Sequence, residues 1–238
     1  MFLSRVSLRA NADGRSPMRA LMARTLSQVG NGHHMVWSLF DYRGNEQERE
    51  FLYRMHNHSL DTIWVLSKHE PRDDSGLLEI ECRPNQIVAN LQDGDHIRWS
   101  LRVNATVTER APGTTGEDWR QHRGRRVCLV RQTRKRMEDK NCRRHTDLDA
   151  AVEAIPSWLS PRLGAIGLQA TPNMIEVTDV VRRQFLHDAK SSKAPITMTM
   201  TDIQGVATVQ DANLFKAGIL KGIGRGGAYG AGMLMVAH

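Results

Sequence analysis

Apolar and polar residues follow regular spacings through the second half of the chain, and these spacings predict four strands and two helices. The stretch PITMTMTDIQGVATV alternates as a strand or a bulged pair of strands does. The first helix has Thr146 as its cap, and Pro156 is expected at a break between two short helices. The predicted order is strand, helix, strand, strand, helix, strand, over residues 125–131, 147–163, 173–186, 195–209, 211–221 and 232–238.

The first half of the chain shows a less regular version of the same order. Its clearest strand is HIRWSLRVNATV, in which Ile97, Trp99, Leu101 and Val103 fall on one face. No second helix is legible between the third strand and this last one. The remaining predicted elements are a strand at 2–10, helices at 18–29 and 33–40, and strands at 51–55, 62–66 and 77–82.

The segment ERAPGTTGED, residues 109–118, has the composition of a linker or an exposed loop between the two halves. We therefore predict an α+β fold of two tandem ferredoxin-like domains, residues 1–108 and 109–238. Each domain would have the order βαββαβ and an antiparallel sheet. Such a fold serves many functions, so the function has to be argued from particular residues.

Composition places the chain among globular proteins, with 40% hydrophobic and 25% charged residues in 238. No apolar run approaches the roughly 20 residues that cross a bilayer, so no membrane partner is expected. Cys82, Cys128 and Cys142 form no CxxC pair, which favours a reducing compartment and no zinc module. His56 and His58 have no evident third ligand nearby, so we expect no metal site.

The excess positive charge is confined to one stretch, residues 119–144. This stretch has eleven Arg or Lys against two acids, whereas the rest of the chain has 22 basic and 24 acidic residues. Arginine suits phosphates, and the apolar residues 127–130 predict a folded strand between basic loops rather than a tail. The alternative is a solvated charged loop. No aromatic RNP-type strand is present, so RNA contact through phosphates and shape is favoured over base stacking. The candidate RNA-binding residues are Arg123, Arg125, Arg126, Arg131, Arg134 and Arg136.

The segment KGIGRGGAYGAGMLMVAH contains Gly222, Gly224 and Gly227 at the spacing GxGxxG. A dinucleotide-binding loop follows a strand and opens a helix, but these glycines follow a predicted helix and precede a predicted strand. No phosphate-binding GxxxxGK[ST] motif occurs, so no nucleotide cofactor is expected. From spacing alone the glycines form a helix cap and a flexible turn, and whether their N–H groups face phosphates stays open.

The segment VGNGHHMVWSLFDY predicts a helix with Asn31 as its cap and His33 and His34 in its first turn. The positive end of a helix attracts a phosphate and lowers the pKa of a neighbouring imidazole, which favours the neutral form. A neutral histidine beside a phosphodiester is what metal-independent RNA cleavage requires. In the structural alternative, one histidine caps the helix and the other faces solvent.

Four segments together resemble the CasE family, the CRISPR repeat-cleaving endoribonucleases of the type I-E Cascade complex. They are MFLSRVSL, HHMVWSLF, WSLRVNATV and KGIGRGGAYGAGMLMVA, in the family's order along the chain. The family's pattern H-x-x-x-W-x-x-F places the catalytic histidine on His33, with Trp37 and Phe40 at the required spacings, and His34 does not fit. Family members often have tyrosine where this chain has Gly30, so an assisting group would come from elsewhere, His34 or an arginine.

The resemblance implies an endoribonuclease that binds the hairpin of a CRISPR repeat and cuts at its base without metal or cofactor. The products would carry a 2′,3′-cyclic phosphate and a 5′-hydroxyl. The protein would stay on its RNA in the prokaryotic cytoplasm and join the other Cascade subunits, especially the backbone subunit. The glycine-rich loop would lie against RNA through Gly222, Gly224, Gly226, Gly227 and Gly230. The alternatives are a non-catalytic RNA-binding subunit of the same fold and, third, a nucleotide-cofactor enzyme.

Overall fold

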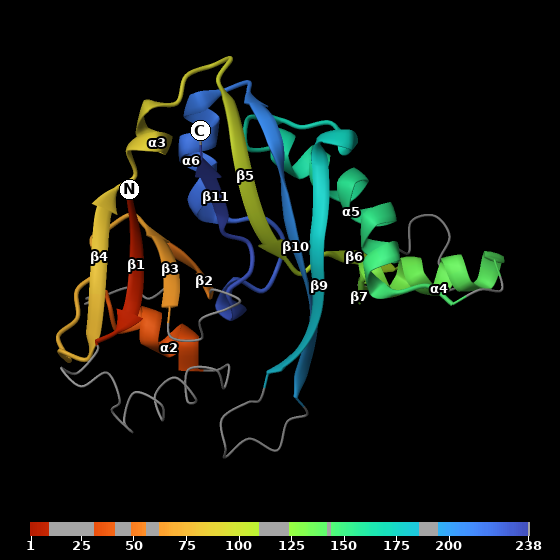
Figure 1. The fold of residues 1–238 in the computed structure, drawn as a ribbon, viewed down its shortest axis with the longest axis horizontal. Coiled ribbons are helices and arrows are strands. Elements are labelled where there is room, and N and C mark those ends of the chain that lie inside the picture. Colours follow the sequence, from red (N-terminus) through yellow and green to blue (C-terminus); the bar gives the residue numbers. More distant parts are fainter. Residues whose placement is uncertain are drawn as a thin grey trace.

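A computed structural model describes residues 1–9, 31–40, 49–55, 62–109, 124–141, 144–185 and 195–237. Within them, two antiparallel sheets lie next to each other and a helical arm projects from the second (Figure 1). The predicted α+β class with antiparallel sheets is confirmed. The predicted helix at 18–29 and Arg123 fall outside the described residues.

The N-terminal sheet has the strand order β2-β3-β1-β4, which is the order of a ferredoxin-like sheet. Alternation along the first strand buries Ser4, Val6 and Leu8 on one face. The connection at 68–77 between the third and fourth strands forms bends rather than a helix. The strands are β1 (Phe2–Leu8), β2 (Phe51–Met55), β3 (Thr62–Ser67) and β4 (Leu78–Pro84).

Two short helices flank this sheet. The helix α2 (Asn31–Trp37) packs its apolar side chains onto Val6, Phe51 and Tyr53. The helix α3 (Gln86–Asn90) follows β4, and the side chain of Asn85 caps it by accepting from the Val88 N–H at 3.2 Å. The chain then leaves the N-terminal sheet for the second one.

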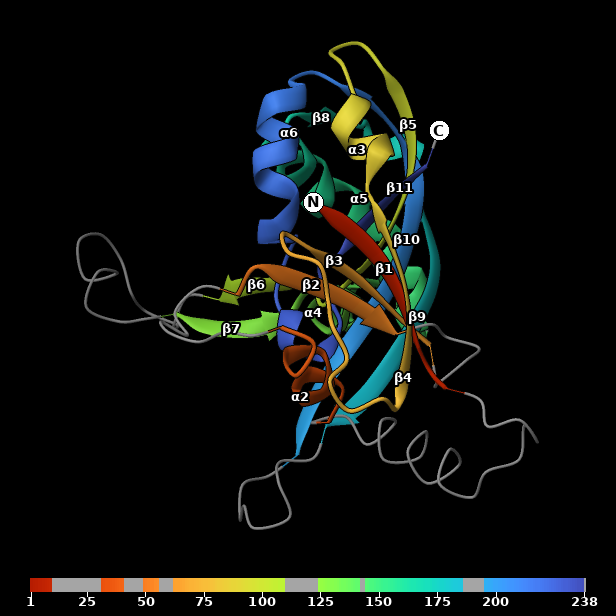
Figure 2. The same ribbon diagram turned by 90° about the vertical axis from the view of Figure 1, so that its left-hand side faces the viewer.

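The C-terminal sheet has the order β11-β5-β10-β8, with β9 also paired to β10. If β5 is counted as the first strand, followed by β9, β10 and β11, this sheet repeats the ferredoxin-like strand order. The strands β9 and β10 extend beyond the sheet as a long ribbon (Figures 1 and 2). The bounds are β5 (His96–Val103), β8 (Leu168–Gln169), η2 (Pro172–Met174), β9 (Ile175–Phe185), β10 (Ile196–Val209) and β11 (Leu234–Ala237).

The strand β5 corrects the expected division of the chain at residue 109. We predicted this strand as the last of the N-terminal unit, but it pairs with β10 and β11 in the C-terminal sheet. Leu101, for example, lies opposite both Ile203 and Leu234. The two sheets therefore divide between Pro84 and His96. Alternation identifies a half-buried strand but does not specify which sheet it joins.

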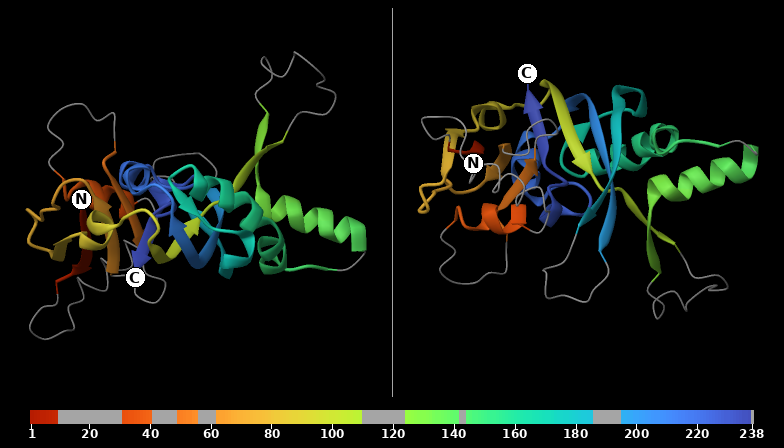
Figure 3. Two further views of the ribbon diagram at one scale, coloured as in Figure 1. Left: turned by 90° about the horizontal axis from the view of Figure 1, so that it is seen from above. Right: turned by 60° about the horizontal axis from the view of Figure 1, so that its bottom comes forward.

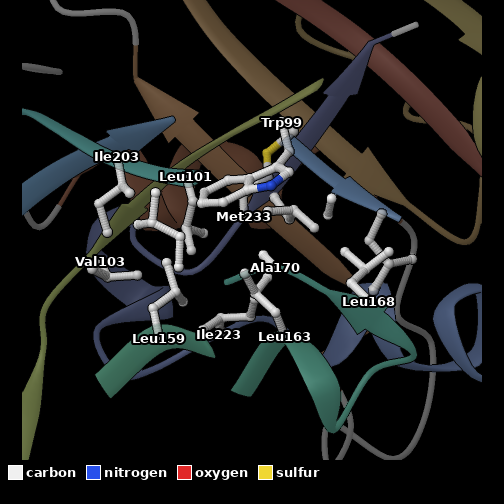
Figure 4. Packing of buried hydrophobic residues seen from close by; sticks show 14 of the residues in the cluster. Trp99, Leu101, Val103, Leu159, Leu163, Leu168, Ala170, Ile203, Ile223 and Met233 are labelled. Atoms are coloured by element: carbon white, nitrogen blue, oxygen red, sulfur yellow. The ribbon is translucent and has the colours of Figure 1, made fainter. Parts of the chain in front are cut away.

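The core of the C-terminal sheet lies between its strands and the helices α5 (Asp147–Gly164) and α6 (Ala212–Gly218). Figure 4 shows Trp99, Leu101 and Val103 of β5 facing Leu159 and Leu163 of α5. Leu52 and Leu66 of the N-terminal sheet belong to the same buried cluster. The two sheets thus share part of one core.

The predicted strand at 125–131 is wrong in its second half. Among the strands that the structure describes, β7 (Arg125–Cys128) pairs only with β6 (Thr106–Glu109), and the chain then becomes the helix α4 (Leu129–Asn141). Residues without branching at Cβ, namely Leu, Arg, Gln, Lys and Met, dominate this helix, and such residues favour helix over strand. The ribbon β6–β7 and the helix α4 form the arm that projects from the body (Figures 1 and 3).

The helix α5 is continuous through Pro156 and Pro161, so the predicted break at Pro156 is wrong. Thr146 caps it as expected, within a capping box completed by Asp149. Buried residues on both sides of Pro156, among them Ile155 and Leu159, hold the helix against the sheet. This packing outweighs the hydrogen bond that proline removes.

A buried cluster of charged side chains joins the two sheets through Arg54 and Met55 of β2, whereas its ion pair between Arg102 and Asp202 lies within the C-terminal sheet, on β5 and β10. The guanidinium of Arg102 donates to both carboxylate oxygens of Asp202 at 2.8 Å, and also to the Met55 carbonyl at 3.1 Å. Arg54 of β2 donates to Asp202 at 3.4 Å and to the Ser100 hydroxyl at 3.1 Å. The side chains of Arg102 and Asp202 are 6% and 9% exposed. Burial lowers the pKa of Arg54, and the charge of Asp202 opposes that shift.

Replacing Asp202 by Ala is expected to lower the free energy of unfolding by about 3–5 kcal/mol. Arg102 and Arg54 would keep their buried positive charges without this carboxylate, and breaking one side of a buried pair is strongly destabilising. Urea unfolding followed by circular dichroism measures the change.

Glu81→Ala is the matched control, because Glu81 pairs with Arg5 at 3.2 Å where both side chains are about half exposed. Exposed pairs contribute less than about 1 kcal/mol. Equal stability of the two variants would contradict the importance assigned to Asp202.

Candidate active site

His33 lies in α2, held in place by Trp37 one turn further along the helix. The indole Nε1–H of Trp37 donates to Nε2 of His33 at 2.8 Å, and the two rings meet edge to face with centroids 5.8 Å apart. Residues four apart share a helix face, which explains the spacing between them. Because Nε2 accepts a hydrogen bond, it carries no proton, and the imidazole in this arrangement is neutral.

The aromatic residues of the same motif fix α2 on the strand β2. Phe40 stacks on Phe51 with centroids 5.0 Å apart, and Trp37 meets Phe51 edge to face at 5.2 Å. The Tyr53 ring, two positions further along β2, lies 6.5 Å from the His33 ring. The rings of His33, Trp37 and Phe40 therefore belong to one packing unit, which holds the imidazole near the Tyr53 ring of β2.

Tyr53 connects this helix to the glycine-rich segment. Its hydroxyl donates to the Ala228 carbonyl at 2.6 Å. Burial raises the pKa of Tyr53 far above its ordinary value, and the positive charge of Arg49 opposes part of the rise. The hydroxyl thus stays protonated, with its hydrogen directed at the loop, and Tyr53 is a structural link rather than a base.

The glycine-rich segment follows α6 and the turn η3 (Ile219–Lys221) and leads into β11, as the sequence predicted. Its short turn η4 (Gly227–Tyr229) contacts α2. Gly227 lies against Arg49 and Gly230 against the Tyr53 ring.

The other predicted glycines lie elsewhere in the segment. Gly222 borders Leu52 and Gly224 borders Trp158, both in the shared core. Gly226 caps η4 in the left-handed conformation. The structure thus brings part of the predicted glycine set to His33 and leaves part of it packed on the core.

The predicted arginines divide into two groups. Arg134 pairs with Asp147 at 2.7 Å and Arg136 with Glu153 at 2.7 Å, so both hold α4 to α5. The other described members are exposed and form no ion pair within the described ranges; they are Arg125, Arg126 and Arg131.

The arm that carries all these arginines is not brought beside His33. Figures 1 and 3 show α4 and α2 on opposite sides of the C-terminal sheet. The sequence analysis missed Tyr53, whose ring lies near His33, and Arg49, which lies against Gly227. Their contacts with the glycine turn join distant parts of the chain, and no local motif indicates them.

The described residues contain no group of three His, Cys, Asp or Glu side chains placed to hold a metal ion. None of their helices is long and apolar enough to cross a membrane.

Solved structures share this fold over the whole chain. The structure of "CRISPR endoribonuclease Cse3 bound to 19 nt RNA" has 20% identity and a TM-score of 0.63, covering 100% of this chain and 99% of that one. Thermus thermophilus Cse3 bound to an RNA representing a pre-cleavage complex has 20% identity and a TM-score of 0.58, covering 100% and 98%. Cas6e from Escherichia coli K-12 has 19% identity and a TM-score of 0.56, covering 100% and 99%.

No curated protein matches the chain in sequence. The family model described as CRISPR associated protein matches residues 1–238, which is the whole chain. With the Cse3 and Cas6e folds, this match confirms the predicted resemblance to CasE, and the chain belongs to this family of CRISPR-associated proteins.

Proposed function

We propose that this chain is a metal-independent endoribonuclease that binds the hairpin of a CRISPR repeat and cuts it at its base. The observation that carries the proposal is the neutral imidazole of His33, oriented by Trp37 beside the glycine turn. The fold supports it, because similar structures include a CRISPR endoribonuclease bound to RNA and a CRISPR RNA-guided surveillance complex. The protein stays on its product and enters Cascade with the guide RNA.

The proposed reaction needs only proton transfer and positioning. The ribose 2′-oxygen bonds to phosphorus while Nε2 of His33 takes its proton, and for this step the 2′-hydroxyl has to displace the indole N–H of Trp37 from that nitrogen. The bond from phosphorus to the 5′-oxygen breaks, and the imidazolium returns the proton to that oxygen. The products are a 2′,3′-cyclic phosphate and a 5′-hydroxyl. The reaction consumes no water and uses no metal ion.

Arg125, Arg126 and Arg131 serve binding rather than chemistry in this proposal. They are exposed on the arm and carry no acidic partner within the described residues, so their guanidinium groups suit backbone phosphates of the RNA stem. Arg134 and Arg136 already pair with acids of α5 and contribute less.

His33→Ala is expected to slow cleavage by about 10²–10⁴-fold, which is the usual effect of losing a general acid or base. Hairpin affinity should change little, because the imidazole acts on the transition state. His34→Ala is expected to be much milder. Single-turnover cleavage of a labelled repeat hairpin measures all three rates, and cleavage should persist in EDTA.

Each other outcome has a definite meaning. Activity lost in EDTA would refute the metal-independent mechanism, and a His33→Ala protein that cuts at the wild-type rate would remove His33 from the reaction. A wild-type protein that binds its own repeat without cutting it would favour the non-catalytic RNA-binding subunit.

Replacing Arg125, Arg126 and Arg131 together by Ala should weaken hairpin binding and flatten its salt dependence. Each lost phosphate contact removes about 0.7–0.9 from the slope of log K against log salt. The control replaces Arg134 and Arg136, and its slope should stay near that of wild type. A wild-type slope in the triple variant would place the RNA away from the arm.

A further inference from the structure

The guanidinium of Arg49 lies against one side of Gly227. A Cβ atom at this position would lie 2.8 Å from Nη1 of Arg49 and closer still to Nη2. Gly227 is not among the glycines with positive φ, so its backbone does not demand glycine. A side chain at this position would instead collide with the guanidinium of Arg49, which lies directly on the turn.

Arg49 lies near two side chains that pack with the His33 helix. The guanidinium carbon lies 5.9 Å from the centre of the Phe51 ring, which also contacts Trp37. Its charge acts on Tyr53, whose ring lies 6.5 Å from that of His33 and whose hydroxyl binds the residue after Gly227. Arg49 therefore lies against the same turn that α2, the helix of His33, contacts.

The proposed reaction creates a particular electrostatic need at this place. As the 2′-oxygen bonds to phosphorus, negative charge grows on the two non-bridging phosphate oxygens. The planar fork of arginine donates two parallel hydrogen bonds and matches a pair of such oxygens. A cation that already lies in place before the reaction stabilises that charge without having to reorganise.

We infer that Arg49 is a second catalytic residue, which contacts the phosphate at the cleavage point while His33 moves the protons. This inference rests on the proposed function. It assigns Gly227 a role as well, since the absent side chain is what lets the guanidinium lie on the turn.

Arg49→Ala is expected to slow single-turnover cleavage by about 10²–10³-fold, the usual effect of removing one donor to a developing oxyanion. Hairpin affinity should fall much less than the rate. Arg49→Lys should recover part of the rate, and added guanidinium ion should raise the rate of Arg49→Ala but not that of wild type. A purely structural role predicts neither recovery.

Gly227→Ala tests the same idea from the other side. The new methyl group should displace the guanidinium and slow cleavage, and the double variant with Arg49→Ala should be no slower than Arg49→Ala alone. Gly164→Ala is the matched control, because nothing lies within 4 Å of a Cβ there. Thermal melting of every variant reports folding.

Cleavage by Arg49→Ala at the wild-type rate, with His33→Ala inactive, would overturn this inference and leave the proposed function standing. A loss of hairpin affinity equal to the loss of rate would make Arg49 a binding residue only. A loss that neither lysine nor guanidinium ion recovers would mark its role as structural. Wild-type protein that does not cut would overturn both proposals.

Discussion

The buried cluster of Arg102 and Asp202 with Arg54 is the constraint on which the arrangement of the two sheets depends. A buried charge pair tolerates little displacement, because its hydrogen-bond geometry must offset the cost of leaving water. Arg54 carries this constraint into β2, where side chains alternate between two surroundings. Leu52 and Arg54 face the C-terminal sheet, whereas Phe51 and Tyr53 face α2. The strand β2 therefore fixes the position of the candidate active site relative to the C-terminal sheet.

The sequence predicted those elements whose evidence is local. Alternation located β2 and β3 closely, and the spacing of His33 and Trp37, which was matched only to the family's pattern, corresponds to a contact in the structure. Partners distant in the chain left no such signal. The pairing of β5 with β10 and the contact of Gly227 with Arg49 depend on which surfaces meet, and composition at either position does not specify that.

The basic stretch shows how far charge alone can be interpreted. The sequence located the basic stretch but did not show which of its arginines are available to bind RNA. In the structure, Arg134 and Arg136 form ion pairs with Asp147 and Glu153 of α5. Helix α4 also replaced part of the predicted strand, which changed the faces on which the arginines lie. A count of basic residues therefore overestimates the surface that is open to a phosphate backbone.

The hydrogen bond from Tyr53 to Ala228 joins residues 175 positions apart. During synthesis, His33 and its aromatic neighbours leave the ribosome long before the turn that completes their surroundings. A nascent or prematurely terminated chain consequently lacks the assembled site, even when its N-terminal sheet has folded.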